Sequence, residues 1–477
     1  MNKKMINLIL IYIWIFLLCL AICSTNWALN TFAFLSFDET LFTLTTPIKS
    51  AESSILNSYL VDGLLSSILL SIPVYILFQS TFLRLKKKRR VFLGSILVTI
   101  IVFYVCLDKV TFMDYIQKQF VSSDFIEENY VDPKNVSIVF PEKKRNLIYI
   151  YVESFESSYF SKELGGAGEH NYLEAITDLT KNHIQFSDSD QFGGAISVPG
   201  TTWTSAAMVA HSSGIPLKVN IRNSMESPLL SDAMNLGDIL EENGYHQMLM
   251  VGSIATFGKR RYYYKQHGNF EIYDYYTAID EEKIKSDYSV WWGFEDSKLF
   301  RFAKEELVNL ASSEVPFHFT LLTANTHTPN GYLEDDCPKE YETQYENVVA
   351  CSASQLAEFI TWIQAQDFYS NTTIVVVGDH ISMQYGLYPK EDRRRIYNLF
   401  INSAIQTENT HNRKFCTMDF FPTTLRSIGV EIVGNRLGLG TDLFSDEKTL
   451  MEEVGVSTFQ SEISKRSKFY QQKFMSF

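Results

Sequence analysis

The stretch NLIYIYVES, residues 146–154, predicts a buried strand that ends abruptly at a carboxylate. A second stretch, TIVVVGDH at residues 373–380, has the same design and ends in Asp379 and His380. Near-continuous Val/Ile runs are typical of central strands in a parallel sheet that is covered on both faces. Ligands of such sheets bind beyond the carboxyl ends of the strands. The two stretches therefore predict an α/β domain with a site at one edge of its sheet.

Short apolar runs alternate with helix-like stretches from residue 146 onward. Further runs lie at 248–251, 317–322 and 397–401, and helix-like stretches at 229–243, 296–312 and 352–366. This alternation favours a central, mostly parallel sheet flanked by helices. We expect this domain to cover residues 146–477. Residues 111–145 are expected to be a linker, whose amphipathic helices lie either on a membrane surface or against the domain.

Three uncharged apolar runs precede residue 110, at 5–23, 64–83 and 91–107. A membrane-spanning helix needs about 20 apolar residues, so the runs predict a three-helix transmembrane anchor over residues 1–110. The first run is longer than the apolar core of a cleaved signal peptide, roughly 7–15 residues, which favours an uncleaved anchor.

Basic residues set the expected orientation of this anchor. Lys3 and Lys4 precede the first run, and the loop between the second and third contains Arg84, Lys86, Lys87, Lys88, Arg89 and Arg90. Positive loops stay in the cytoplasm. We therefore expect a multi-pass membrane protein whose residues after about 110 face outward; in a Gram-negative bacterium it would lie in the inner membrane with this part in the periplasm.

The net charge bears on the expected partners, and the cysteines bear on the compartment and on the kind of metal site. The formal net charge of −13 excludes nucleic acid as an expected partner, because phosphate-backbone binding requires a basic face. Cys337 and Cys351 flank a polar segment and are candidates for a disulfide in an oxidising compartment. Cys416 would then remain a buried thiol, and no CxxC pair supports a thiolate metal site.

The strand-end residues are candidate metal ligands. A carboxylate at the end of a central strand is unfavourable unless it is paired or metal-bound, which singles out Glu153. The alternative is an acid at a helix N-terminus beside a capping Ser154. Asp379 and His380 offer a carboxylate and an imidazole to one divalent ion. The alternative for His380 is a hydrogen bond to the neighbouring loop.

A hydroxyl-rich turn, GTTWTSAAM at residues 200–208, lies between the two strand stretches. Small helix-forming residues follow Thr204 and predict a helix that begins there. The N–H groups at a helix N-terminus favour phosphate. A neutral threonine is a weak nucleophile that metal coordination would activate. Composition alone favours the alternative that Thr204 only caps the helix.

Residues 198–217 resemble the nucleophile region of the periplasmic phosphoglycerol transferases that decorate osmoregulated glucans. These enzymes group with lipoteichoic acid synthases and phosphoethanolamine transferases in the alkaline phosphatase–sulfatase superfamily. Further segments resemble the family in the same order: 146–156, 252–268, 323–329, 376–383, 415–429 and 434–445. The similarity covers roughly residues 145–445 and implies an alkaline phosphatase-like fold for the extracytoplasmic domain.

The resemblance assigns expected roles to individual residues. It implies a metal site, with Thr204 also acting as the nucleophile, made of Glu153, Thr204, Asp379 and His380. It implies substrate contacts by His327, Arg260, Lys259 and Trp203, with the register within Lys259-Arg260-Arg261 open by one residue. Lipoteichoic acid synthases carry a tryptophan at the position of Gly258. The stretch SVPGT at 197–201 has threonine where the C/S-x-P-x-R frame of sulfatases has arginine, which argues against sulfatase chemistry.

The implied activity is transfer of a phosphoglycerol group from phosphatidylglycerol to a cell-envelope glycan through a covalent phosphothreonine intermediate. One divalent ion is expected; oxygen ligands with one imidazole favour Mn²⁺, with Zn²⁺ and Mg²⁺ as alternatives. Two other functions stay open: a phosphoethanolamine transferase acting on lipopolysaccharide, and a non-catalytic membrane protein that binds envelope glycan. Nothing in the sequence selects the acceptor polymer.

Overall fold

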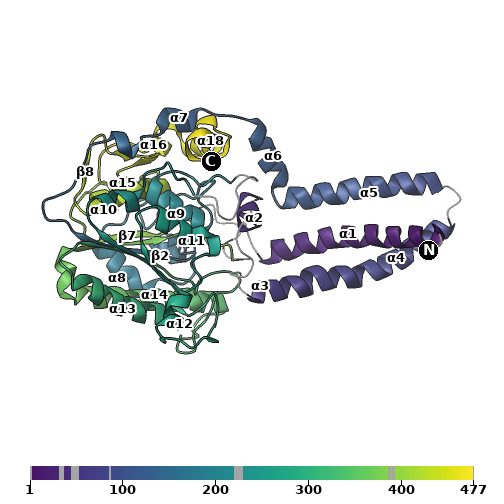
Figure 1. Cartoon of the computed structure of the whole chain (residues 1–477), viewed down its shortest axis with the longest axis horizontal. Helices are drawn as coiled ribbons and strands as arrows, with labels where there is room; N and C mark the ends of the chain where they lie inside the picture. The colour runs from purple at the N-terminus through teal and green to yellow at the C-terminus, as the bar shows by residue number, and fades with distance from the viewer. Residues whose placement is uncertain are drawn as a thin grey trace.

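The computed structural model describes residues 3–31, 37–44, 53–84, 88–219, 229–384, 388 and 393–475. An α/β domain forms one end of the molecule, and three long helices project from it side by side (Figure 1). These are α1 (Lys3–Thr31), α4 (Ser66–Arg84) and α5 (Lys88–Lys109). The predicted fold class, an apolar three-helix segment followed by an α/β domain, is confirmed.

The projecting helices are long and apolar enough to cross a membrane over Met5–Thr31, Leu56–Thr81 and Phe92–Lys109. The first two spans exceed the predicted runs because helix continues through polar residues. The second begins in α3 (Ser53–Ser58) and passes through the π-helix Tyr59–Leu65. Within the bundle, Trp14 Nε1 donates to Thr99 Oγ1 at 2.9 Å and Trp27 Nε1 to Ser58 Oγ at 2.6 Å. Such pairing satisfies polar groups away from water.

A six-stranded sheet forms the centre of the α/β domain, in the order β4-β3-β5-β2-β6-β7. Its strands are β2 (Asn146–Val152), β3 (His246–Val251), β4 (Glu271–Tyr273), β5 (Phe317–Leu322), β6 (Thr372–Gly378) and β7 (Asn398–Ile401). All neighbours are parallel except β6 and β7. The predicted parallel sheet is thus confirmed, with an antiparallel edge strand that the sequence pattern did not indicate.

Helices cover both faces of this sheet (Figure 1). One face carries α9 (Thr204–Ser213), α10 (Leu236–Glu242), α11 (Arg260–Gln266) and α15 (Phe420–Ser427). The other carries α8 (Glu174–Asn182), α12 (Tyr275–Asp280), α13 (Asp296–Ala311) and α14 (Gln344–Gln364). Alternate residues of β2 belong to different apolar cores, one on each face of the sheet. Leu147 and Tyr149 pack into the first core, and Ile148 and Ile150 pack into the second. β2 is therefore a rigid central platform for the residues that follow it.

Most of the segment expected to be a linker packs against the α/β domain. α6 (Phe112–Phe120) connects α5 to the domain and contacts α2 (Phe37–Leu44). From there α7 (Phe125–Asn129) packs on α17 (Val456–Ser464) and α18 (Lys468–Phe474). β1 (Ile138–Val139) pairs with β8 (Glu431–Ile432).

The C-terminal part of the domain adds α16 (Leu450–Val454) and the antiparallel pair β9 (Arg436–Leu437) and β10 (Gly440–Thr441). A disulfide joins Cys337, in the loop before α14, to Cys351 within that helix. Cys416 is a buried free thiol.

Candidate active site

Two neighbouring strands end at the same edge of the sheet and place three candidate ligands together. β2 pairs in parallel with β6, with Val152 opposite Gly378. Glu153 and Asp379 therefore leave adjacent strands at the same level. A side chain at Gly378 would place its Cβ 1.9 Å from the Phe155 carbonyl oxygen. Glycine is thus required for the two strand ends to approach this closely.

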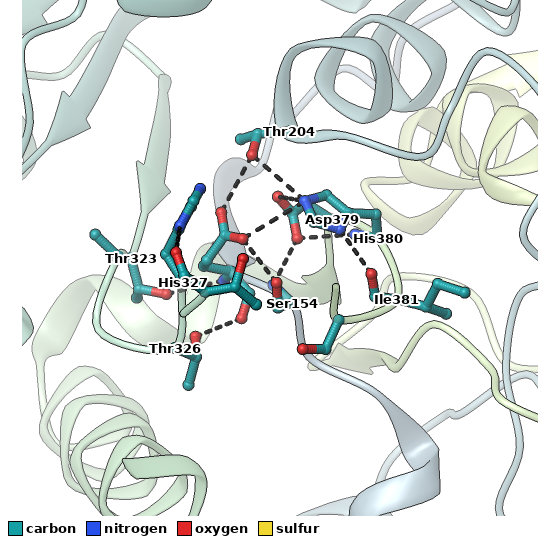
Figure 2. Close-up of polar contacts among 12 residues, drawn as sticks. Ser154, Thr204, Thr323, Thr326, His327, Asp379, His380 and Ile381 are labelled. Carbon is teal, nitrogen blue, oxygen red and sulfur yellow. Dashed lines mark hydrogen bonds and ion pairs between the residues drawn. The ribbon is translucent and has the colours of Figure 1, made fainter. Parts of the chain in front are cut away.

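Thr204 joins this cluster from the first residue of α9, where the sequence predicted a helix start. Its Oγ1 donates to Glu153 Oε2 at 3.2 Å and lies 3.5 Å from His380 Nε2 (Figure 2). Ligand atoms of Glu153, Asp379 and His380 all lie within 4.8 Å of one another, and the three residues are buried. The structure therefore brings together all four residues that the sequence singled out as a metal site.

Backbone contacts orient the ligand atoms toward each other. Asp379 Oδ1 accepts from the backbone N–H groups of Ser154 and His380, both at 2.8 Å. Its Oδ2 is buried, 3.3 Å from His380 Nε2, with no hydrogen-bond partner among the described residues. His380 Nδ1 donates to the Ile381 carbonyl at 2.8 Å, which leaves Nε2 as the ligating nitrogen. Two carboxylates, an imidazole and a hydroxyl with an unsatisfied buried oxygen fit one divalent cation.

The electrostatics of the cluster also favour a cation. Burial, reinforced by neighbouring Glu153, raises the pKa of Asp379 to about 7. Burial opposes a charged imidazole, yet Asp379 and Glu153 hold the pKa of His380 above its ordinary value. Two carboxylates this close repel each other unless positive charge lies between them. A divalent ion would supply that charge without protons.

The loop after β5 carries His327 and is attached directly to Glu153. The Glu153 N–H donates to Thr323 Oγ1 at 3.0 Å, and the Thr326 hydroxyl donates to the Glu153 carbonyl (Figure 2). His327 Nδ1 donates to the Thr328 carbonyl at 2.6 Å. Burial lowers the pKa of His327, although the Glu153 carboxylate opposes this effect. A neutral imidazole is thus held beside the cluster.

The basic residues at the start of α11 lie on the same side of the sheet as α9. Arg260 is buried, and its guanidinium donates to Ser253 Oγ at 3.0 Å and to the Phe257 carbonyl at 3.1 Å. Burial lowers the pKa of Arg260 to about 10, while Glu153 counteracts this shift. Arg261 instead pairs with Asp274 at 2.7 Å. Of the two arginines, Arg260 is therefore the one whose charge interacts with Glu153, whereas Arg261 is neutralised by Asp274.

Lys259 and Trp203 are also buried. Lys259 has a positive φ of 60° and follows Gly258, which has a φ of 62°. This tight turn brings the Gly258 carbonyl to 2.8 Å from Ser205 Oγ, beside Thr204. A Cβ at Gly258 would lie 2.3 Å from that hydroxyl. The space at Gly258 is therefore closed to a large side chain unless Ser205 moves.

The sequence prediction missed a contribution from α2, the short helix between the first two spans. The ring of Phe42 lies 5.9 Å from that of Trp203, and both belong to the same apolar core. Burial raises the pKa of Glu39 to about 8. The charge of Glu153 raises this pKa further, whereas the charge of His380 lowers it. The available signal was an acidic pair, Asp38 and Glu39, within an otherwise apolar N-terminal region.

A protein-family model for the sulfatase domain matches residues 145–430. The chain belongs to the sulfatase family. Among curated relatives, phosphoglycerol transferase I of Escherichia coli is 31% identical over 343 residues, covering 67% of this chain and 41% of that protein. The enzyme of the same name from Citrobacter koseri is 30% identical over 330 residues, covering 66% and 41%. The resemblance to phosphoglycerol transferases is confirmed, although the matched region spans only about two fifths of these relatives.

Solved structures support the fold of this sulfatase-family protein. A protein of the alkaline phosphatase superfamily from Vibrio parahaemolyticus aligns with a TM-score of 0.53 and 20% identity, covering 69% of this chain and 79% of that one. The integral membrane protein lipooligosaccharide phosphoethanolamine transferase A (EptA) from Neisseria meningitidis aligns with a TM-score of 0.52 and 12% identity, covering 88% and 84%. The predicted alkaline phosphatase-like fold is confirmed.

Proposed function

We propose that this protein is a metal-dependent phosphoglycerol transferase that moves phosphoglycerol from phosphatidylglycerol to a glycan of the cell envelope. The observation that carries the proposal is the position of Thr204. Its hydroxyl lies at a helix N-terminus within 3.2 Å of Glu153 and 3.5 Å of His380. The names of the curated relatives support the choice of transferred group.

The reaction proceeds in two displacements. Thr204 loses its hydroxyl proton as Oγ1 attacks phosphorus, the bond to the diacylglycerol oxygen breaks, and that oxygen takes up a proton as diacylglycerol leaves. An acceptor hydroxyl then attacks the phosphoglyceryl-threonine, loses its proton, and releases free Thr204. Glu153, Asp379 and His380 would hold a divalent ion, with Mn²⁺ preferred, and its charge would favour the ionised form of the Thr204 hydroxyl.

Neighbouring groups are placed to hold the transferring phosphoryl group. Arg260 can donate to the non-bridging oxygens, and His327 can donate from Nε2 when the negative charge of the bound phosphoryl group favours its protonated form. The N-terminal N–H groups of α9 add a favourable dipole at the same point. Preorganised donors of this kind are the main source of rate in phosphoryl transfer.

A membrane location explains the arrangement of the chain. α4 ends at Arg84 and α5 begins at Lys88, at the end of the bundle far from the α/β domain (Figure 1). The positive-inside rule then puts the α/β domain in the periplasm and the bundle in the inner membrane. α2 would then lie at the periplasmic surface of the inner membrane, beside the candidate active site and within reach of a lipid donor.

Labelled phosphatidylglycerol and the detergent-solubilised full chain test the proposal. The wild type should release diacylglycerol in a reaction that requires a divalent ion, and Thr204 should gain the mass of phosphoglycerol. Thr204→Ala should abolish both, whereas Thr202→Ala, at a neighbouring hydroxyl, should retain them. Full turnover by Thr204→Ala would reject the scheme. A phosphoethanolamine adduct would replace the donor assignment, and no adduct with any donor would favour a non-catalytic protein.

A further inference from the structure

Three aromatic rings lie together beside the candidate active site. The ring centroid of Trp292 lies 4.6 Å from that of His327 and 5.1 Å from that of Phe257. His327 follows Thr326, whose hydroxyl donates to the Glu153 carbonyl. Phe257 precedes Gly258, whose carbonyl accepts from Ser205, the residue after Thr204. Trp292 therefore borders the space next to the proposed phosphoryl position.

The backbone around Trp292 is held in place at the edge of the sheet. Gly293 forms a bridge with Ser253, just after β3, and the Phe294 N–H donates to the Gly252 carbonyl at 3.1 Å. On the other side, Trp291 Nε1 donates to the Ala324 carbonyl at 3.2 Å, just after β5. Two strand ends thus fix this loop, so that Trp292 is preorganised rather than free to turn away.

The two adjacent indoles differ in their hydrogen bonding. Trp291 Nε1–H has a backbone acceptor, whereas Trp292 Nε1–H is buried and has no acceptor among the residues that the structure describes. Buried N–H groups are nearly always paired in folded proteins. An unpaired donor in a preorganised wall next to a reaction centre indicates that a bound ligand supplies the acceptor.

We propose that Trp292 is a specificity-determining residue that recognises a hydroxyl of the glycerol head group, an inference that rests on the proposed function. Its Nε1–H donates to a hydroxyl oxygen, which has lone pairs to accept. The ammonium of ethanolamine has no lone pair and would leave the indole N–H unpaired. Arg260 is buried and donates to the carbonyl of Phe257, whose ring contacts Trp292, so its guanidinium also disfavours a second cation there. Trp292 therefore selects a neutral polyol head group.

Three lipid donors with identical acyl chains test this role in the detergent-solubilised full chain: phosphatidylglycerol, phosphatidylmethanol and phosphatidylethanolamine. Phosphatidylmethanol keeps the phosphodiester and lacks the head-group hydroxyls. For the wild type, we expect kcat/KM for diacylglycerol release to be at least about 10-fold higher with phosphatidylglycerol than with phosphatidylmethanol. Trp292→Phe keeps an aromatic ring and removes the N–H. It should lose about 10-fold with phosphatidylglycerol and less than about 2-fold with phosphatidylmethanol.

The ratio between the two donors separates recognition from structure, because a merely destabilised enzyme loses activity with both. An unchanged ratio in Trp292→Phe overturns the role of Trp292. If that variant does not fold, the wild-type ratio decides, since a value near one overturns the proposal. A wild type that prefers phosphatidylethanolamine also overturns it. Failure of the proposed function gives a distinct result, with no diacylglycerol from any donor and no adduct on Thr204.

Discussion

Replacing Arg394 with methionine should destabilise the protein and loosen its candidate metal site. Arg394 Nε donates to Glu156 Oε2 at 2.8 Å, and its Nη2 pairs with Oε1 of the same carboxylate and donates to the Ser382 carbonyl at 2.8 Å. The Ser382 N–H donates to Glu156 Oε1 at 2.7 Å. Glu156 follows Glu153 by three residues and Ser382 follows His380 by two. This buried ion pair and its hydrogen bonds to Ser382 therefore connect the two segments that carry the candidate metal ligands.

The expected loss follows from burial of the pair. The side chains of Arg394 and Glu156 are 5% and 0% exposed. Among the described residues, the carboxylate would keep two neutral donors in Arg394→Met, the Ser382 N–H and the Ser158 hydroxyl. Removing one partner of a buried ion pair costs about 3–5 kcal/mol, because the other charge stays desolvated. The entropy of unfolding is about 2.1 cal/mol/K per residue, so a domain of roughly 330 residues loses about 1.4 °C in Tm per kcal/mol, and the Tm should fall by roughly 4–7 °C.

Thermal unfolding of the full chain in detergent, followed by tryptophan fluorescence, measures this effect. The double variant Glu156→Gln/Arg394→Met should recover at least half of the loss, because no unpaired charge remains. Glu169→Gln is the matched control, since it breaks an ion pair with Lys162 in which the two side chains are 79% and 60% exposed, and it should leave the Tm unchanged. A Tm of Arg394→Met equal to that of the control, or a double variant no more stable than the single one, would refute the reasoning.

Three further predictions concern the metal, α2 and the disulfide. Mn²⁺ at 100 times its Kd should stabilise the wild type by about 2.7 kcal/mol relative to the protein in chelator. Glu153→Gln should lose most of this gain, and equal Mn²⁺-induced Tm shifts in the variant and the wild type would contradict the metal site. Phe42→Ala removes a buried ring that contacts Trp203, at a cost of about 3–5 kcal/mol, so limited proteolysis should cleave between α1 and α4 faster than in the wild type; unchanged protection would show that α2 docks by other contacts. The Cys337–Cys351 bridge closes a separation of 14 residues, so Cys337→Ser/Cys351→Ser should cost about 3 kcal/mol, read as a lower Tm; a wild-type Tm insensitive to reductant would contradict this.

Long, locally periodic segments were predictable. The apolar runs that became β2, β3, β5 and β6 carry their signal in consecutive residues, and so do the three apolar helices. β4 was missed because its three residues, Glu271–Tyr273, are too few to show a period. The antiparallel direction of β7 was also missed. A short run such as Asn398–Ile401 does not encode direction, which depends on the path of the preceding loop.

The types of ligand in the candidate site were evident in the chain itself, because a carboxylate or imidazole at the end of a buried apolar run needs a partner wherever the chain goes. Which of several nearby residues enters the site depended on packing between distant segments. Glu153 joins Asp379 and His380, whereas Glu156 pairs with Arg394. The contribution of α2 arises in the same way, since residues near position 40 reach Trp203 only after the anchor and the α/β domain pack together. Sequence neighbours share composition, but only the folded chain distinguishes the side chain that faces the cluster from the one that faces a buried arginine.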